Sequence, residues 1–349
     1  MNITGVPPID KMANIYDNSL VRFWHFLFHD LSDPRTRNWF LVSSPVPGLS
    51  ILIGYHYFIH SWGPKYMEHR KPFQMKNVLV MYNLIQVLLS TWIFIEGLSS
   101  AWLTKYSFKC EPVDFSESPD ALRIARIVHV YFLAKLTELL DTVFFVLRKK
   151  EKQVTFLHVY HHTVMPMIAW GATKYYPGGH GTFIGRNTDK LTMLTMAVDS
   201  TIAAIDRCVF EGLINSFVHI VMYTYYLLAA LLPQYQKYLW WKKYITTLQM
   251  GQFCLAFLHN SQLLLYDCGY PRWSVVLTLP NAIFFYLLFS DFYKMAYEPD
   301  RRKKSTTTAN GKIESNGIAR KVNGNDYDED TSNVSSIRKI KVVDKRKED

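Results

Sequence analysis

The sequence predicts an all-α protein that crosses a membrane several times. Of its 349 residues, 49% are apolar and 15% are aromatic. The apolar residues gather in runs close to the ~20 residues that a helix needs to cross a bilayer, and short polar segments separate these runs. A polytopic membrane protein fits this distribution better than two or three soluble domains of the same total length.

Seven apolar runs are long enough to be transmembrane helices. They lie at residues 39–60, 77–98, 124–147, 154–173, 213–232, 244–266 and 273–297. We therefore expect one seven-helix domain over residues 39–297, preceded by an N-terminal segment of residues 1–38. Residues 1–20 contain no apolar core, so no cleavable signal peptide is expected.

Residues 298–349 are expected to form a disordered tail. They are rich in Lys, Ser, Asn and Asp, and residues 301–349 carry thirteen Lys or Arg against eight Asp or Glu. Such a composition buries too little apolar area to offset the entropy of ordering. A basic tail beside seven spans favours the cytosolic side of a membrane and argues against nucleic-acid binding.

A cytosolic tail and seven spans together place the N-terminus in the lumen. Asn2, in the pattern Asn-Ile-Thr, is then a candidate glycosylation site. Cys110 and Cys268 fall in two luminal loops, where the oxidising setting predicts a disulfide between them. Lys345 and Lys347 match the K-x-K-x-x pattern for retrieval to the endoplasmic reticulum, which predicts residence in that membrane.

Three histidines, His158, His161 and His162, stand in the fourth apolar run. Residues i, i+3 and i+4 of a helix share one face, so the three imidazoles are expected to cluster. Imidazoles that face lipid are costly, and the cluster is therefore expected to look into the protein. One buried histidine is usually a packing residue, but three on one face each need a partner, which favours a functional site.

The third run carries Lys135, Glu138 and Asp141 at intervals of three residues. Charged residues inside a membrane span usually mark a functional site. The alternative is a structural ion pair between Lys135 and Glu138. Both interpretations place these side chains in the protein interior.

Two further runs add polar groups to the same interior. Asn215, His219 and Tyr226 are predicted to share an inward stripe of the fifth run. Gln249 and Gln252 lie three residues apart in the sixth run, where amides often only hold helices together. Four helices would thus meet in one polar interior, as in a transporter or an enzyme, and the number of histidines favours an enzyme.

Five segments follow one another in the order in which a known family carries them. They are KLTELLDT, FVLRKKEKQVTFLHVYHHTVMP, PGGHGTF, NSFVHIVMYTYY and TTLQMGQF. Over roughly residues 22–297 the chain resembles the very-long-chain fatty acid elongases, and the HxxHH block with its flanks is highly specific. The resemblance implies seven transmembrane helices, six of them forming a barrel around a narrow acyl tunnel. It also implies condensation of acyl-CoA with malonyl-CoA to 3-oxoacyl-CoA, CoA and carbon dioxide, the first step of each elongation cycle.

The resemblance further implies that the middle histidine of the block, His161, carries the acyl group on its imidazole, with ping-pong kinetics. Histidine can act as a covalent nucleophile, and a dry tunnel protects the intermediate from hydrolysis. Asn215 and His219 are candidates to stabilise the enolate that decarboxylation of malonyl-CoA produces. His158 and His162 are candidates to set tautomers or to shuttle protons.

The other polar residues are candidates for orienting groups or for binding the CoA thioesters. Asp141 or Glu138 is expected to orient an imidazole, and Lys135 to meet a CoA phosphate or the malonyl carboxylate. Lys149 and Lys150 suit the phosphates of CoA, or they form a cluster of the positive-inside kind. The remaining binding candidates are Glu138, Gln249, Gln252 and Tyr226. No metal and no cofactor are expected; the expected partners are the two CoA thioesters, lipids of the endoplasmic reticulum membrane and other enzymes of the cycle.

Two other functions are compatible with parts of the sequence. HxxHH also occurs as a ligand box of membrane di-iron desaturases and hydroxylases. His25/His29 and His56/His60 would have to join it, but the predicted topology puts these pairs on opposite sides of the membrane. A lipid channel or scaffold without turnover would keep the helices and would not need His161.

The chain departs from the family pattern between the fourth and fifth runs. In the family, PGGHGTF leads almost directly into the helix with the NxxxH pattern, whereas here residues 186–212 intervene. Their apolar core, residues 191–205, is too short for a span and contains Asp199. We therefore expect an inserted luminal loop that contains an amphipathic helix, or a segment introduced by alternative splicing or mistranslation.

Overall fold

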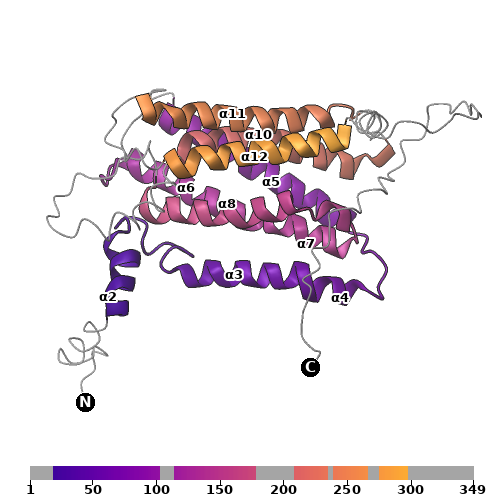
Figure 1. Cartoon of the computed structure of the whole chain (residues 1–349), viewed down its shortest axis with the longest axis horizontal. Coiled ribbons are helices and arrows are strands. Elements are labelled where there is room, and N and C mark those ends of the chain that lie inside the picture. Colours follow the sequence, from indigo (N-terminus) through magenta and orange to yellow (C-terminus); the bar gives the residue numbers. More distant parts are fainter. Residues whose placement is uncertain (1–18, 103–113, 178–207, 235–238, 266–274, 298–349) are drawn as a thin grey trace, which may run out of the picture. The chain divides into compact units, whose positions relative to one another are not determined.

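The computed structural model describes residues 19–102, 114–177, 208–234, 239–265 and 275–297, and every regular element in these ranges is a helix. By their internal contacts, residues Met1–Pro299 and Asp300–Asp349 form two separate compact units. All described residues belong to the first unit (Figure 1). The predictions for Asn2, Cys110, Cys268 and the tail at 298–349 concern residues outside the described ranges.

Each of the seven predicted runs contains a helix. The elements are α2 (Ser19–His25) continuing into the π-helical turn η1 (Phe26–Asp30); α3 (Pro45–Tyr57), which passes through η2 (Phe58–Trp62) into α4 (Gly63–Met67); α5 (Lys76–Gly97) with η3 (Leu98–Trp102); α6 (Pro119–Thr137) and α7 (Leu139–Leu147); the short turn η4 (Glu151–Gln153); α8 (Phe156–Tyr175); α10 (Cys208–Leu231); α11 (Lys242–Leu265); and α12 (Val275–Tyr297).

Three helices begin five or more residues away from their predicted starts, and two of these starts have a clear local cause. The first predicted run starts at residue 39, but α3 begins at Pro45, where the Ser44 side chain accepts a hydrogen bond from the amide of Val46. In the same way, α6 begins at Pro119 after Ser118, which caps the amide of Ala121. Ser at the N-cap followed by Pro fixes a helix start whatever the hydropathy of the preceding residues.

The fifth helix begins earlier than predicted, because α10 starts at Cys208. Residues 208–212 are therefore helical and do not belong to the loop that was predicted to end at residue 212. Glu211, in the first turn, accepts a 2.7 Å hydrogen bond from the side-chain amide of Asn260 in α11. The rest of the predicted insertion, 186–207, lies outside the described residues.

The long helices lie side by side, and their contacts follow a fixed order (Figure 1). Helix α5 packs against α6 and α10, α6 against α8, α8 against α12, α12 against α11, and α11 against α10. Helix α3 packs on α7 instead, where Leu52, Tyr55 and Ile59 form one apolar cluster with Leu139 and Val146.

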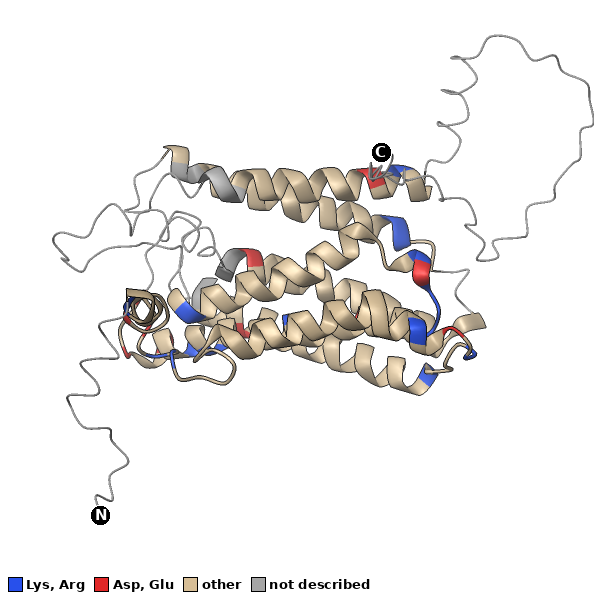
Figure 2. Cartoon of the chain, turned by 60° about the horizontal axis from the view of Figure 1, so that its bottom comes forward, with Lys and Arg blue, Asp and Glu red and all other residues tan. Residues whose placement is uncertain are grey.

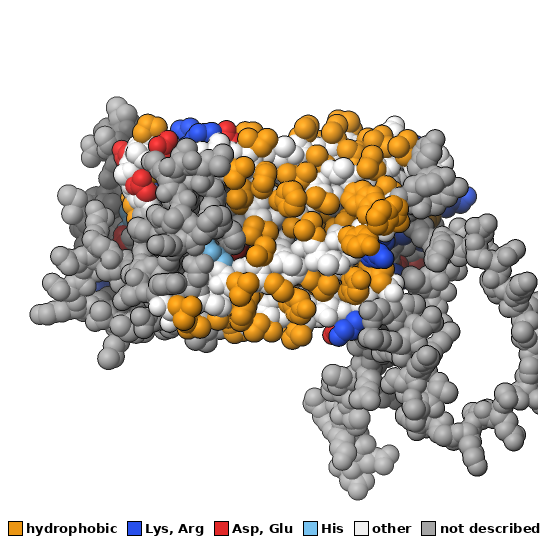
Figure 3. All heavy atoms as spheres, turned by 90° about the horizontal axis from the view of Figure 1, so that it is seen from above, with side chains coloured by type: hydrophobic (Ala, Val, Ile, Leu, Met, Phe, Trp, Pro, Cys, Tyr) orange, Lys and Arg blue, Asp and Glu red, His pale blue; other side chains and the backbone are white. Residues whose placement is uncertain are grey.

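Helix α5 buries polar side chains and exposes apolar ones. Its buried residues include the polar Asn83, Gln86 and Ser90, whereas Leu88 and Ile95 are 61% and 57% exposed. Polar inside and apolar outside is the reverse of the pattern in a soluble protein and is the pattern of a helix that faces lipid. Figure 3 shows the same on a larger scale, with apolar side chains over the middle of the visible face.

Two described helices, Lys76–Ser100 and Glu211–Leu231, are long and apolar enough to cross a membrane. Lys, Arg, Asp and Glu gather toward the helix ends, and the middle of the helices is nearly devoid of them (Figure 2). We conclude that the protein is a membrane protein. That the five other predicted runs also cross stays a prediction.

Candidate active site

The three histidines of α8 lie together. Thr155 caps the helix by accepting a hydrogen bond from the amide of His158, and this places the histidines in its first two turns. The ring of His162 lies 4.2 Å from that of His158 and 5.2 Å from that of His161, measured between centroids. His162 is buried, and the other two are half-buried. The spacing of the sequence thus produces the expected cluster of imidazoles.

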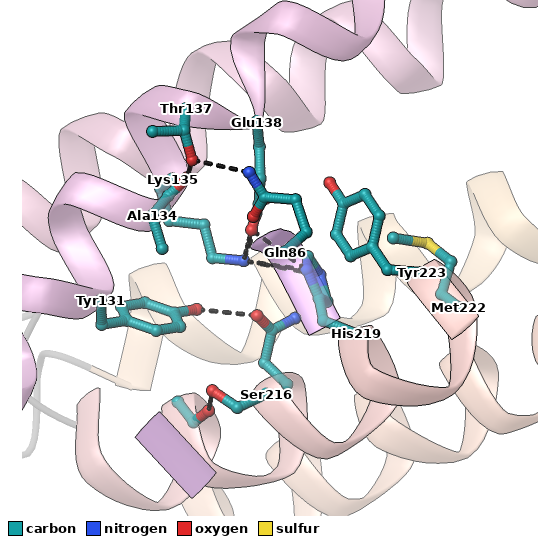
Figure 4. Close-up of polar contacts among 12 residues, drawn as sticks. Gln86, Tyr131, Ala134, Lys135, Thr137, Glu138, Ser216, His219, Met222 and Tyr223 are labelled. Atoms are coloured by element: carbon teal, nitrogen blue, oxygen red, sulfur yellow. Dashed lines mark hydrogen bonds and ion pairs between the residues drawn. The ribbon is translucent and has the colours of Figure 1, made fainter. Parts of the chain in front are cut away.

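Lys135, Glu138 and His219 form a second cluster (Figure 4). The Lys135 ammonium lies 2.8 and 3.0 Å from the two carboxylate oxygens of Glu138. Nδ1 of His219 lies 3.1 Å from Oε1 of the same carboxylate. Lys135 and Glu138 are each 2% exposed, so both charges are compensated inside the protein and not by water.

The local backbone explains why Glu138 points inward. Glu138 stands between the end of α6 and the start of α7, and its amide still donates to the carbonyl of Ala134. The amide of Asp141 then donates to the carbonyl of Glu138, so this hydrogen bond spans three residues instead of the four of an α-helix. This tight turn interrupts the helix beside the histidines, and it keeps Lys135 and Glu138 on the side that faces α10.

The two clusters belong to one site. His161 and His162 are close enough to Lys135 and Glu138 for their charges to interact, and His161 also interacts with His219. The ring of His161 packs edge-on against Phe285 of α12, with 5.8 Å between centroids. The imidazole of His161 therefore contacts α12, and charged groups of α6 and α10 are near enough to interact with it.

Asn215 and Asp141 are held by tyrosines. The Tyr131 hydroxyl donates a 3.0 Å hydrogen bond to Oδ1 of Asn215, so the amide NH2 is the group of Asn215 that can donate to a ligand. The Tyr223 hydroxyl donates a 2.7 Å bond to Asp141. Of the two carboxylates considered for orienting an imidazole, Glu138 contacts one and Asp141 contacts a phenol instead.

Comparison with known protein families identifies the family to which this chain belongs. The model described as the ELO, GNS1/SUR4 family, matches residues 40–188 and 190–306. The chain belongs to the ELO family. The segment between the two matches is a single residue, inside the stretch 186–212 that was predicted to be an insertion.

Several relatives of this ELO protein carry the same name. The chain is 45% identical over 282 residues to a very long chain fatty acid elongase of Aedes aegypti, covering 80% of this chain and 71% of that one. It is 43% identical over 305 residues to very long chain fatty acid elongase 7 of Drosophila melanogaster, with 87% and 83% covered. It is 40% identical over 283 residues to very long chain fatty acid elongase 1 of Homo sapiens, with 80% and 91% covered.

The other predicted site residues of this ELO protein lie nearer the edge. Tyr226 is 41% exposed, and its ring lies 6.1 Å from that of the buried Tyr223. Its place on the inward stripe stays a prediction. Gln249 and Gln252 are half-buried, and Gln249 donates to the sulfur of Met222 at 3.7 Å. This contact between α11 and α10 matches the expectation that such amides hold helices together.

Lys149 and Lys150 follow α7 and are half-buried. Lys149 has a left-handed backbone, with φ of 54°, and its ammonium donates to the carbonyl of Glu68 at 3.1 Å. The predicted binding lysines therefore stand where α7 ends and close to the end of α4. Lys135, the third predicted binding lysine, is engaged by Glu138.

Sequence reasoning missed the hydroxyl groups that hold this site. Tyr131 and Tyr223 bond to site residues directly, and Tyr55 reaches His158 through Thr142. A tyrosine inside an apolar run is indistinguishable from a packing residue. For two of them a local signal existed. Tyr131 precedes Lys135 by one helical turn and Tyr223 follows His219 by one turn, so each shares a face with a residue already singled out.

The histidine pairs outside the α8 block do not join it in the way a di-iron site would require. Nε2 of His56 lies 2.9 Å from the Thr163 hydroxyl. Among the described residues, one group has the geometry to hold a metal ion: His25, His29 and Asp30, in α2 and η1. None of its members belongs to the HxxHH block.

Proposed function

We propose that this protein condenses a long-chain acyl-CoA with malonyl-CoA, giving 3-oxoacyl-CoA, CoA and carbon dioxide. Its relatives are named very long chain fatty acid elongases, and the family membership covers most of the chain. The observation that carries the chemical part is the imidazole of His161, which packs against Phe285 of α12 and lies near the charged cluster of Lys135, Glu138 and His219.

The acyl chain would lie in a tunnel between six helices. The contacts of α5, α6, α8, α12, α11 and α10 run in a closed order, which is the order that a barrel of these helices requires. Helix α3 would then be the seventh span, outside the barrel. With an odd number of spans and a basic cytosolic tail, the N-terminus lies in the lumen of the endoplasmic reticulum.

In the first half-reaction, His161 attacks the thioester carbonyl carbon. The carbon–nitrogen bond forms and the carbon–sulfur bond breaks. His158 or His162 accepts the proton that the His161 ring releases and passes it to the CoA sulfur. Apolar helices exclude water, and this lets the acyl-imidazole survive until malonyl-CoA binds. Lys149 and Lys150 are the candidates for binding the phosphates of CoA.

In the second half-reaction, the malonyl carboxylate leaves as carbon dioxide and the electron pair forms the new carbon–carbon bond. The bond to His161 breaks, and the imidazole takes up a proton from solvent, which is the one proton that the overall reaction consumes. The NH2 group of Asn215, oriented by Tyr131, donates to the enolate oxygen. Nδ1–H of His219 donates to Glu138, so in the neutral ring Nε2 carries the lone pair. His219 therefore suits proton acceptance better than donation. The thioesters supply the activation, and no cofactor is required.

The experiment is condensation by the purified full chain, with isotopic malonyl-CoA and a panel of acyl-CoAs and products identified by mass. We expect His161→Ala to abolish product and the acyl adduct that the wild type forms with acyl-CoA alone. His69→Ala is the matched control, because that side chain is 91% exposed. Product formation by a folded His161→Ala variant contradicts the proposal. So does a wild-type protein that holds about two irons per chain and does not condense.

A further inference from the structure

One side chain of α3 reaches the histidines by hydrogen bonds, although α3 lies outside the closed order of helices. The Tyr55 hydroxyl lies 2.8 Å from Oγ1 of Thr142 in α7. The same Oγ1 lies 2.9 Å from Nε2 of His158 in α8. Tyr55 is 6% exposed and Thr142 is completely buried. Three helices thus contribute one group each to a chain of hydrogen bonds that ends on the HxxHH block.

The two hydrogen bonds that join Tyr55, Thr142 and His158 have one favoured donor direction. A phenol hydroxyl is a better donor than acceptor, while a threonine hydroxyl donates one hydrogen bond and accepts others. Tyr55 therefore donates to Thr142, and Thr142 donates to Nε2 of His158. Nε2 then carries the lone pair, and the proton of the neutral ring resides on Nδ1. Each bond polarises the next, so the buried chain is stronger than its separate bonds.

The surroundings keep this arrangement rigid. Tyr55 packs in the apolar cluster that joins α3 to α7. The next residue, His56, bonds to Thr163 of α8. Two consecutive residues of α3 therefore hold it to α7 and to α8. Apolar packing alone does not need the Tyr55 hydroxyl, because phenylalanine has the same ring. A buried hydroxyl is costly without partners, and here its partner leads to a histidine.

We propose that Tyr55 is a positioning residue of the enzyme: through Thr142 it fixes the tautomer and the ring orientation of His158. This inference rests on the proposed function and assigns its proton roles: His162 accepts the proton of His161, while His158, whose lone pair is engaged by Thr142, offers its Nδ1–H. The hydroxyl pair acts through His158 and does not itself meet the substrates.

Two pairs of variants test the relay in full-length protein. Thr142→Val removes the hydroxyl at nearly constant shape, and Thr142→Ser keeps it. Tyr55→Phe removes the phenol hydroxyl, and Tyr57→Phe makes the same change on the same helix at a side chain that is 63% exposed. We expect Thr142→Val and Tyr55→Phe to lower kcat about tenfold, a fraction of what a positioned proton-transfer group contributes, with the KM for acyl-CoA changed less than about twofold. Thr142→Ser and Tyr57→Phe should match the wild type.

The double variant and a chemical label separate a relay from simple packing. If both hydroxyls act in one chain, Tyr55→Phe combined with Thr142→Val is no slower than Thr142→Val alone. Carbethoxylation of His158, located by peptide mass, should be faster in Thr142→Val and unchanged in Thr142→Ser, because Nε2 loses its hydrogen bond only in the first.

Additive losses of kcat, or a lowered melting temperature with unchanged kcat and unchanged labelling, overturn the proposal. The labelling does not depend on turnover. A wild type that fails to condense therefore refutes the proposed function, while the labelling still decides on the relay.

Discussion

Glu138 connects the two halves of the site, because its carboxylate contacts both Lys135 and His219. The sequence offered two interpretations of Lys135 and Glu138, a functional charge pair or a structural ion pair. The ion pair is present, and the contact with His219 makes the carboxylate a link between α6–α7 and α10. Removing the charge of either Lys135 or Glu138 is therefore costly, because the other charge stays buried.

The ion pair gives a prediction for stability. Lys135→Met or Glu138→Gln should each lower the free energy of unfolding by about 3–5 kcal/mol, since each removes the opposite charge from a charged group that stays buried. The double variant should be more stable than the sum of the two losses predicts. Thermal unfolding in detergent measures both.

The matched control is the pair of Arg123 and Glu96, whose side chains are 45% and 26% exposed. Changing either residue of that pair should cost about 1 kcal/mol or less, because exposed ion pairs contribute little. Equal losses at the two pairs would show that burial does not determine the strength of the Lys135–Glu138 pair.

At the scale of the element, α8 contains a proline where its histidines end. Pro166 is buried and lies four residues after His162, so the carbonyl of His162 has no amide donor one turn further on. A proline inside a helix distorts it locally. The turn that ends at Pro166 begins at His162, the last residue of the HxxHH block, so we expect the proline to influence where the histidines lie.

Pro166→Ala should raise the melting temperature, or leave it unchanged, and lower the rate of condensation about tenfold or more. The substitution restores a backbone hydrogen bond, and a displacement of about 1 Å at reacting groups can cost roughly a hundredfold in rate. Pro280→Ala in α12 is the control, because Pro280 is also inside a helix but is exposed. If both variants keep the wild-type rate, the proline does not place the histidines.

At the scale of the whole molecule, the closed order of helix contacts brings residues distant in sequence to one place. Helix α10 packs against α5 and α11, and its His219 meets Glu138 from the α6–α7 turn. The segment before α10 is where the sequence predicts an insertion. Because α10 begins at Cys208, any insertion ends by residue 207.

Deletion of residues 186–207 should leave the rate of condensation within about twofold of the wild type. Surface loops accept added length at little cost, and the deletion keeps Glu211 and its bond to Asn260. A second deletion that extends to residue 212 removes Glu211 and should lose activity. Activity confined to the shorter deletion, with none in the full chain, would mean that the segment blocks the working enzyme.

The sequence by itself determined the helices and their local faces. Each of the seven apolar runs corresponds to a helical region, whereas the helical segment Ser19–Asp30 was not predicted. The spacing of His158, His161 and His162 predicted their cluster. The Lys135–Glu138 pair was likewise predictable, since its members are one turn apart. Each of these follows from the rise and twist of a single helix, which the order of residues alone specifies.

The tertiary structure alone decided what those faces meet. It decided that Glu138 contacts His219, that Tyr226 lies partly exposed, and that Tyr55 reaches His158 from a helix outside the closed order. Such contacts depend on how each helix is rotated and shifted against its neighbours. Packing across the whole assembly sets these rotations, and no local pattern in one helix records them.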